Sequence, residues 1–461
     1  GGAAAGRDAG ADRGADVSGV DVSGAAGGGL AGGGLAGSGG LLELLVAAPA
    51  EGPVRLIDAG TWRMLARGEA ALHFYGLFVS GARVYALFGA AAGTLLVATD
   101  LADSAYPSIA AGFPMAAWFE RLARDLTGAV ALEAEDRRPA IAQGAAGSDA
   151  AWPRFIETAG EGGFQIGQGP VAGVIAAPVH RRFSLDGGVV TRLEHRLGYA
   201  HRGIAGLMRG KSPRAAARFA ARIAGDATVA HAVAFARAAE AASGVAAPPR
   251  AAAVRAVMLA IERVTGDLAA LSAAVGLGGD ARFAALLGQA REQVAGAVGE
   301  VFGHRLMMDV VVPGGLAVDV RSAAVPALVA ALDRAGMVVR AVFWARVRRD
   351  LAAAAGMAQA RARAVRAMGR VARQGLAALP EGIIAQALPA ASGMGLGVAE
   401  SARGLVHHWL DLADGQIRDC CAIDASARLL AVLEAVVVGL EFEAAAMVIA
   451  CFGLSVSAID G

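Results

Sequence analysis

The sequence predicts an α+β protein, with a small N-terminal α/β domain followed by a mainly α-helical domain that carries short β elements. Between about residues 54 and 136 the chain has short apolar runs separated by glycine and serine, which is typical of a small sheet. Beyond about residue 200 it has long alanine-rich stretches with helix-stop signals. We expect a Gly/Ala-rich disordered leader over 1–50, the α/β domain over 51–150 and the helical domain over 160–461.

The charge balance excludes two broad classes of protein. Lys and Arg total 42 against 41 for Asp and Glu, a net charge of +1, so the bulk charge indicates neither a nucleic-acid binder nor an acidic tail. The chain is 56% hydrophobic but only 5% aromatic, which indicates helices rich in small side chains. Lys211 is the single lysine, a skew typical of a GC-rich genome and without functional weight.

The cysteine content and the apolar runs indicate in which cellular compartment the protein resides. Cys420, Cys421 and Cys451 are too few for a disulfide framework and form no C-x-x-C pair, so a reducing compartment is expected. The most apolar run, 429–440, contains Glu434, so no membrane-spanning segment is expected. The first residues lack a basic-then-apolar signal pattern, so export is not expected.

The N-terminal domain is expected to contain three strands and one helix. The apolar runs 72–79, 84–88 and 94–98 predict the strands. Trp118, Leu122, Leu126 and Val130 recur at helical spacing and predict a helix that closes the domain.

The second domain is expected to contain long helices. Ser212 followed by Pro213 is a helix start, which predicts a helix over about 213–243 with an interruption at Gly225 and Asp226. Further helices are expected at about 250–273, 281–301, 322–335 and 341–378. The glycine-rich run 393–397 lacks the lysine of a phosphate-binding loop and is interpreted as an ordinary loop.

A run of arginines between residues 340 and 373 contains a single acid, Asp350. Arg363, Arg366, Arg370 and Arg373 are spaced three, four and three residues apart, which puts them on one helix face. This face is either simply solvated or a docking stripe for an acidic partner or an anionic membrane. Nucleic acid is not expected as a partner, because no aromatic side chains interleave with the arginines.

Several motifs resemble one family over roughly residues 70–460. They are PVHRRF (178–183), RLEHRLGYAHRGI (192–204), LMRGK (207–211), RIAG (222–225), FGHRLMMD (302–309) and PGG (313–315). Together they resemble the large subunit of membrane-bound energy-converting nickel–iron hydrogenases, including formate hydrogenlyase, and its relative, the quinone-site subunit of respiratory complex I. Upstream, WFER (118–121) and DRRP (136–139) are similar to the small peripheral subunit of complex I, which is fused to the large one in formate hydrogenlyase.

The resemblance implies a metal site that this sequence cannot build. Hydrogenases of this family hold nickel and iron with two C-x-x-C pairs, because thiolates are soft ligands. Aligned on Arg222 and His231, the first pair falls at Ala224 and Ala227. Aligned on Asp460, the second falls at Ser455 and Ala458. The four positions lack sulfur, so we expect no nickel–iron centre, no metal and no hydrogen turnover by this chain.

The remaining polar residues of the motifs are the candidate site. The complex I relative uses a histidine after the Gly-Pro pair, where position 172 here is alanine. His180 could replace it in binding a quinone oxygen or could hydrogen-bond a turn. Glu194, His201 and Asp226 could belong to a proton path, with Tyr199, His201 and Arg202 on one helix after Glu194, or Glu194 could form ordinary surface pairs.

Two further histidines have a structural interpretation as well as a functional one. His231 is a candidate site residue or a packed helix residue, and His304 is interpreted as a turn residue. Neither nicotinamide nor an iron–sulfur cluster is expected on this chain, since a G-x-G-x-x-G fingerprint and four ligand cysteines are both missing.

The resemblance implies a subunit of a hydrogenase-like or complex-I-like (NADH:quinone oxidoreductase-like) assembly. The chain would lie on the cytoplasmic side of the inner membrane as a peripheral subunit. Its expected partners are an iron–sulfur small subunit, which carries the cluster, and antiporter-like membrane subunits. The alternatives are a quinone-reducing subunit that uses the emptied cavity and a non-catalytic scaffold or regulatory relative.

Overall fold

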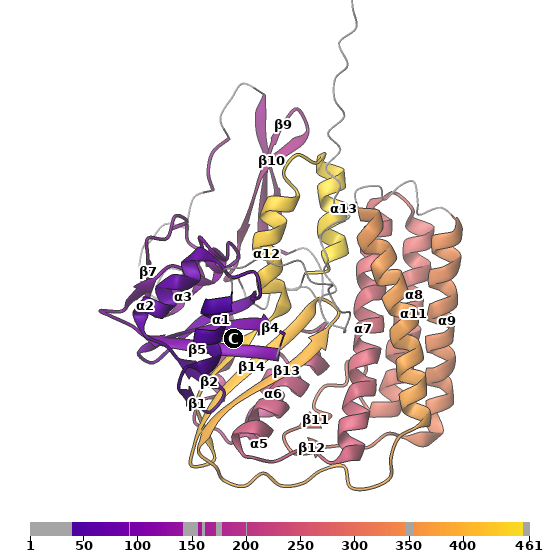
Figure 1. Ribbon diagram of the computed structural model, residues 1–461. Coiled ribbons are helices and arrows are strands. Elements are labelled where there is room, and N and C mark those ends of the chain that lie inside the picture. Colours follow the sequence, from indigo (N-terminus) through magenta and orange to yellow (C-terminus); the bar gives the residue numbers. More distant parts are fainter. Residues whose placement is uncertain are drawn as a thin grey trace, which may run out of the picture.

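The computed structural model describes residues 39–91, 93–141, 155–158, 162–171, 178–199, 201–345 and 354–454. It has the predicted α+β architecture (Figure 1). An N-terminal sheet with its helices lies beside a C-terminal sheet, and a bundle of long helices stands on the other side of that second sheet.

The N-terminal part is a five-stranded sheet of order β1-β2-β5-β4-β3, with α3 packed on β3. Its elements are α1 (Gly39–Ala47), β1 (Ala50–Glu51), β2 (Val54–Leu56), α2 (Ala59–Met64), the 3-10 helix η2 (Leu65–Arg67), β3 (His73–Ser80), β4 (Arg83–Ala90), β5 (Gly93–Asp100), β6 (Ala105–Pro107), α3 (Ala116–Thr127) and β7 (Val130–Leu132). Strands β3, β4 and β5 confirm the three predicted strands.

Two N-terminal predictions need correction. The leader was predicted to extend to residue 50, but α1 begins at Gly39 and buries Leu41 and Leu45 in the core, which gives this segment enough apolar contact to order it. Residues 1–38 lie outside the described residues. The predicted helix ends earlier than expected, because Gly128 adopts a left-handed conformation that caps α3, and Val130 begins β7.

A three-stranded sheet of order β10-β9-β8 follows. Its strands are β8 (Gly163–Gln168), β9 (His180–Asp186) and β10 (Val189–Arg196). Glu194 therefore lies on a strand, and Tyr199 and Arg202 lie in the loop after it, so the prediction of one helix for these residues was wrong. The alternation of charged and apolar residues in β10 matches a strand period.

Short helices lead into the C-terminal sheet. These elements are α4 (Ile204–Met208), α5 (Pro213–Ala220), α6 (Thr228–Ala242), β11 (Val311–Val312), β12 (Gly315–Leu316), β13 (Gly393–Ser401), β14 (Gly404–Ala413) and β15 (Gln416–Ile423). The Ser212 side chain accepts a hydrogen bond from the Ala215 N–H, which confirms the predicted helix start. The break predicted at Gly225 and Asp226 separates α5 from α6.

Helix α6 packs directly on β13, and glycine makes this contact possible. A Cβ atom at Gly395 would lie 2.0 Å from the Ala238 carbonyl oxygen, and one at Gly397 would lie 1.9 Å from that of Ala234. Glycine at these positions therefore allows close approach of helix and strand. The interpretation of 393–397 as a loop was wrong, since the segment is the first half of β13.

The helical bundle consists of α7 (Pro249–Leu277), α8 (Ala281–Phe302), α9 (Val325–Ala345) and α11 (Ala355–Ala377), with the 3-10 helix η3 (Ser322–Ala324) leading into α9. Figure 1 shows these helices side by side, and α7 packs against α8 and α11 while α9 packs against the same two. The predicted helices at 250–273 and 281–301 are confirmed as α7 and α8.

Two C-terminal helices, α12 (Ala425–Val436) and α13 (Phe442–Phe452), join the parts. Helix α12 contacts α3, β3, β10 and β14, and α13 contacts α7. The two sheets meet at Trp409, whose ring lies 5.4 Å from that of Phe78 and 5.2 Å from that of Tyr85. Such aromatic contacts join the N-terminal sheet to the rest of the chain.

Two surface predictions are modified by the bundle. The helix Ser322–Phe343 is long and apolar enough to cross a membrane by length and composition alone, and 28% of its most apolar window is buried. Arg361, which precedes the arginine face on α11, is 13% exposed and pairs with Asp267 and with the last carbonyls of α13. Arg363, Arg366 and Arg370 are exposed on α11.

Candidate functional site

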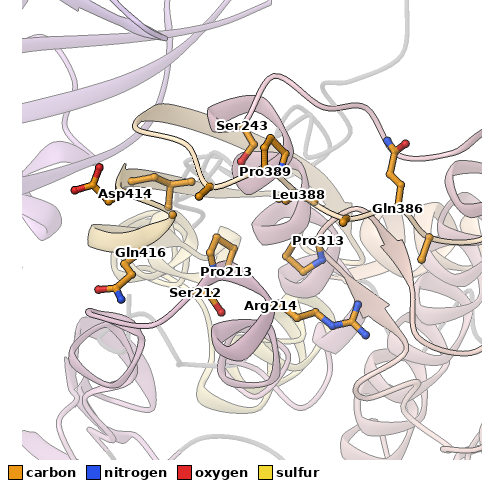
Figure 2. Close-up of a pocket in the computed structure, with 15 residues that line it drawn as sticks. Ser212, Pro213, Arg214, Ser243, Pro313, Gln386, Leu388, Pro389, Asp414 and Gln416 are labelled. Atoms are coloured by element: carbon orange, nitrogen blue, oxygen red, sulfur yellow. The ribbon is translucent and has the colours of Figure 1, made fainter.

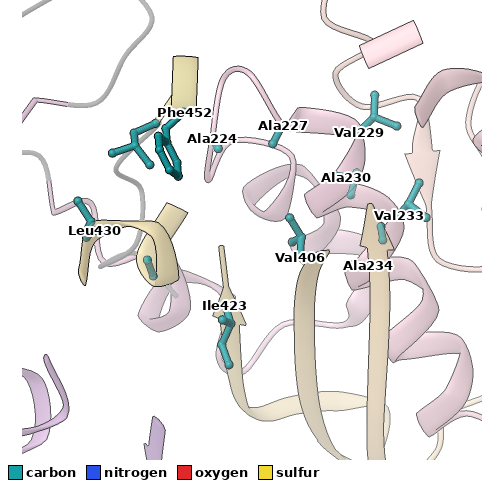
Figure 3. Packing of buried hydrophobic residues seen from close by; sticks show 14 of the residues in the cluster. Ala224, Ala227, Val229, Ala230, Val233, Ala234, Val406, Ile423, Leu430 and Phe452 are labelled. Carbon is teal, nitrogen blue, oxygen red and sulfur yellow. The ribbon is translucent and has the colours of Figure 1, made fainter. Parts of the chain in front are cut away.

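The first pair of expected metal-ligand positions lies in the turn before α6. The methyl groups of Ala224 and Ala227 are 2% and 0% exposed, and Figure 3 shows them among buried apolar side chains near Phe452. Methyl groups offer no lone pair to a metal, and they fill space in a packed core. Ser455 and Ala458 lie outside the described residues. Within the described ranges, no group of three His, Cys, Asp or Glu side chains could hold a metal ion.

The cysteine thiols are packed as core residues. Burial raises the pKa of Cys451, on α13, to about 11 and that of Cys420, on β15, to about 12. Cys420 and Cys421 are adjacent on this strand, so their side chains point to opposite faces, as predicted. Protonated, buried thiols of this kind are inert rather than ligating. The donor set of the described chain therefore does not fit a nickel–iron group.

A carboxyl group caps the helix that follows the two alanines. Glu262, on α7, accepts hydrogen bonds from the N–H groups of Val229 (2.6 Å) and Ala230 (3.0 Å) in the first turn of α6. Burial raises the pKa of Glu262 to about 8, although the two N–H donors oppose the shift. Glu262 is thus a proton-binding group near neutral pH at the helix end where the hydrogenase site would be.

Beside Glu262, five side chains form one connected network, which we name the His231 chain. Asp226 and Asp424 both pair with the buried Arg403, whose NH2 group lies 3.4 Å from Asp424 Oδ2. The same Asp424 oxygen lies 2.9 Å from His231 Nε2, and His231 Nδ1 lies 3.0 Å from His408 Nε2. Asp226 is 28% exposed and the other members are buried, so the network leads from the surface into the core.

The charges of the His231 chain follow from burial and pairing. Burial would raise the pKa of Asp424, but Arg403 and the hydrogen bond from His231 hold it well below its usual range. Burial, together with the neighbouring histidines, holds the pKa of His408 well below its usual range. Because His231 Nε2 donates to the Asp424 carboxylate, the contact between the two rings holds one proton.

Position 407 adds a further buried imidazole. Burial and the nearby Arg428 lower the pKa of His407 to about 3, and its ring lies 4.9 Å from that of Tyr75 on β3. Within the described part of the chain, neither ring nitrogen of His407 has a hydrogen-bond partner. His407 is therefore a neutral packing residue at the junction of the two sheets.

A second buried set of charges, the Glu194 cluster, surrounds β10. Glu194 is 1% exposed and lies 3.5 to 3.7 Å from the guanidinium nitrogens of Arg138, Arg192 and Arg196. The adjacent His195 Nδ1 lies 3.2 Å from Glu434 Oε1 on α12. The alternative that Glu194 forms ordinary surface pairs is wrong, since this carboxylate is buried among several cations.

The other predicted residues lie apart from the His231 chain. His180, on β9, contacts the Tyr199 hydroxyl (3.4 Å) and the ring of Phe155 (4.8 Å). Burial and the nearby Arg182 and Arg196 lower its pKa. His201 is exposed in the loop after β10.

His304 serves the turn role that the sequence predicted. Its Nδ1 atom accepts hydrogen bonds from the N–H groups of Leu306 (3.1 Å) and Met308 (3.4 Å). The histidine thus holds the segment after α8 in a tight turn.

The structure joins two predicted residues and adds Arg403, Asp424 and His408, with Glu262 beside them. Asp226 and His231 belong to one network, whereas Glu194, His180 and His201 do not. Asp424, Arg403 and Glu262 were not predicted as site residues. One local signal was present for Asp424, because aspartate is a preferred N-cap residue, and Asp424 does accept a hydrogen bond from the Ser426 N–H (2.6 Å) at the start of α12.

A cavity of about 720 Å³ lies apart from the His231 chain, next to the start of α5 and the turn between β14 and β15 (Figure 2). Arg214 on α5, Pro313 beside β11, Gln386, and Asp414 in the β14–β15 turn line it. It has no lining residue in common with the His231 chain.

The chain is similar to hydrogenases in three comparisons. Residues 202–269 match the family described as nickel-dependent hydrogenase. Formate hydrogenlyase subunit 5 of Escherichia coli (strain K12) is 27% identical over 197 residues, which cover 38% of this chain and 35% of that protein. The chain thus spans about a third of the length of this relative. The Ni-Fe-Se hydrogenase from D. vulgaris Hildenborough shares the fold, with a TM-score of 0.55 at 14% identity over 65% of this chain and 100% of that one.

Proposed function

We propose that this relative of the nickel-dependent hydrogenase large subunits is a metal-free subunit of a membrane-associated, hydrogenase-like or complex-I-like oxidoreductase. It helps to couple electron transfer to ion translocation and carries no nickel–iron centre of its own. It is a peripheral subunit on the cytoplasmic side of the cell membrane. Its partners are an iron–sulfur small subunit and antiporter-like membrane subunits, and its N-terminal domain corresponds to the small peripheral subunit of complex I.

One observation carries the proposal. The segment that matches the nickel-dependent hydrogenases contains Ala224 and Ala227 where the first thiolates would be, and both are packed in the core. The polar residues around them remain and are connected through the His231 chain. A framework that keeps its proton-binding groups and lacks its metal ligands suits a coupling role better than hydrogen chemistry.

The residues of the site bind protons and carry the charges that hold α6 in place. Glu262 holds the first turn of α6, so a change in its charge alters the hydrogen bonds of the Val229 and Ala230 N–H groups. Arg403 and Asp424 connect the same region to β14 and α12. Proton binding at Glu262 would therefore bias the packing of α6 against its neighbours.

Purification from native membranes under mild detergent tests the proposal. We expect the chain to co-migrate with an iron–sulfur protein and with antiporter-like membrane proteins, and we expect metal analysis of the separated chain to give no stoichiometric nickel. Stoichiometric nickel on this chain, or a chain that purifies alone from the soluble fraction, would contradict the proposal. An Asp226→Asn variant that leaves ion translocation by the complex unchanged would support the scaffold alternative instead.

Quinone binding is a second candidate function, supported by the His180–Tyr199 pair. The two side chains lie 3.4 Å apart beside the ring of Phe155 and offer hydrogen-bonding groups next to an aromatic surface. A water-soluble quinone analogue should raise the melting temperature of the chain, and the double variant H180A/Y199F should lose this shift. A shift that persists in the double variant would place the binding elsewhere.

A further inference from the structure

The outer side of the bundle carries an exposed surface formed by α9 and α11. The ion pair between Asp333 on α9 and Arg373 on α11, with an N–O distance of 2.6 Å, joins the two helices, so their outward sides form one surface. We name this surface the α9–α11 basic face and define it by its exposed residues Arg334, Met337, Arg340, Arg363, Arg366 and Arg370. Figure 1 shows α9 at the outer edge of the molecule.

The positive charge of this face is not neutralised by the chain itself. Among the described residues, no carboxylate lies within ion-pairing distance of Arg363, Arg366 or Arg370, and the same holds for Arg334 and Arg340. Asp333 is already paired with Arg373. Arg361, on the same helix, differs from these arginines because it points inward and binds Asp267 and backbone carbonyls. Five outward arginines remain available to an anionic partner.

Exposed apolar side chains accompany these arginines on α9 and α11. The helix Ser322–Phe343 has a hydropathy of 1.5 over its most apolar window, yet only 28% of that window is buried. Met337 is 61% exposed, and Val371 on α11 is 46% exposed. A soluble acidic partner would require the arginines alone, whereas cations combined with exposed apolar groups are typical of helices that lie in a membrane interface.

We propose that the α9–α11 basic face binds the surface of an anionic phospholipid bilayer. The arginines contact the lipid phosphates, since guanidinium groups match phosphate geometry, while Met337 and the small apolar residues of α9 lie at headgroup depth. This contact belongs to the chain itself and does not depend on membrane partner subunits. It therefore goes beyond the function proposed above and can be tested separately.

Co-sedimentation of the full chain with vesicles tests this inference. We expect binding to vesicles of phosphatidylglycerol mixed with phosphatidylcholine, weaker binding to pure phosphatidylcholine, and a fall in binding as salt is added. The variant R363E/R366E/R370E should lose more than about tenfold in partition to the anionic vesicles. The matched control R63E/R67E/R214E makes the same charge change at exposed arginines of α2, η2 and α5 and should bind as the wild type does.

A second variant separates the lipid from an acidic protein as the partner. The charge-neutral variant Met337→Gln should weaken vesicle binding without affecting binding to polyglutamate, because only a bilayer offers an apolar layer to this side chain. The inference fails if the wild type binds neither vesicle, if it binds both compositions equally, or if the triple variant and its control behave alike. It also fails if polyglutamate binds in a salt-dependent way while anionic vesicles do not. Circular dichroism of each variant checks that the fold is kept.

Discussion

The two buried charge clusters of this protein differ in how their charges are balanced. In the Glu194 cluster, three guanidinium groups surround one carboxylate, and His195 and Glu434 pair beside it. In the His231 chain, a single cation, Arg403, lies between Asp226 and Asp424, and Glu262 stands beside them with a pKa raised by burial to about 8. The first arrangement surrounds one carboxylate with an excess of cations, and the second depends on one cation and on one acid with a raised pKa.

This difference indicates separate roles for the two clusters. The Glu194 carboxylate lies among several arginines, and through Arg138 it ties β10 to α12 and to the segment after β7. A network whose balance changes by one proton near neutral pH can respond to its surroundings. The responsive cluster is the one that lies beside the vacated positions Ala224 and Ala227.

Removal of the single cation of the His231 chain should have the largest effect. Arg403→Met leaves two carboxylates without their shared partner, one of them fully buried, so we expect the free energy of unfolding to fall by about 3–5 kcal/mol. Arg209→Met is the control, because that guanidinium is 53% exposed and pairs with Asp419 at 2.7 Å, an interaction worth about 0–1 kcal/mol. Urea unfolding measures both variants. Equal losses would show that Arg403 is not the centre of a buried network.

The local parts of this architecture could be predicted from the sequence, and the long-range parts could not. Ser212 and Pro213 predicted the start of α5, and apolar spacing predicted α7 and α8, because these signals act within one or two helical turns. Asp424 and Arg403 meet His231 and Asp226 across more than 170 residues of sequence, and no local pattern encodes such pairs.

Two wrong interpretations have the same physical origin. The charged residues of β10 suggested a surface helix, but they are buried because they pair with one another. The glycines of β13 suggested a loop, but they are the condition for α6 to approach the strand. In both cases tertiary contacts override the usual local preference of the residue type.

Titration of Glu262 should have an effect of similar size. Its pKa is raised on folding from an ordinary value near 4.5 to about 8, so the folded state binds more protons between these values. The stabilising contribution is therefore complete at low pH and is lost as the pH rises toward 8, by on the order of 1.4 kcal/mol per unit of pKa difference. We expect the free energy of unfolding to fall between pH 5 and pH 8 more steeply in the wild type than in Glu262→Gln.

The Glu194 cluster provides the control for this pH dependence. Glu194→Gln should lower the free energy of unfolding by about 1–3 kcal/mol, because it weakens buried pairing, but it should keep the wild-type slope with pH. Urea unfolding at several pH values measures all three proteins. If Glu262→Gln kept the wild-type slope, or if Glu194→Gln removed it, the division into a fixed and a responsive cluster would be wrong.

Introduction of cysteines at the first pair of expected ligand positions should have the smallest effect on the free energy of unfolding. In the double variant A224C/A227C, each substitution adds one sulfur atom to a packed position, which we expect to cost about 1 kcal/mol by overpacking. Nickel content after growth with added nickel should stay at background, since Ser455 and Ala458 supply no thiolates for a four-sulfur site. The double variant A216C/A220C places two thiols at equally buried alanines of α5 as the matched control. Nickel retained by A224C/A227C and not by this control would show that the vacated site still assembles a metal centre, and the proposed coupling role would then have to include one.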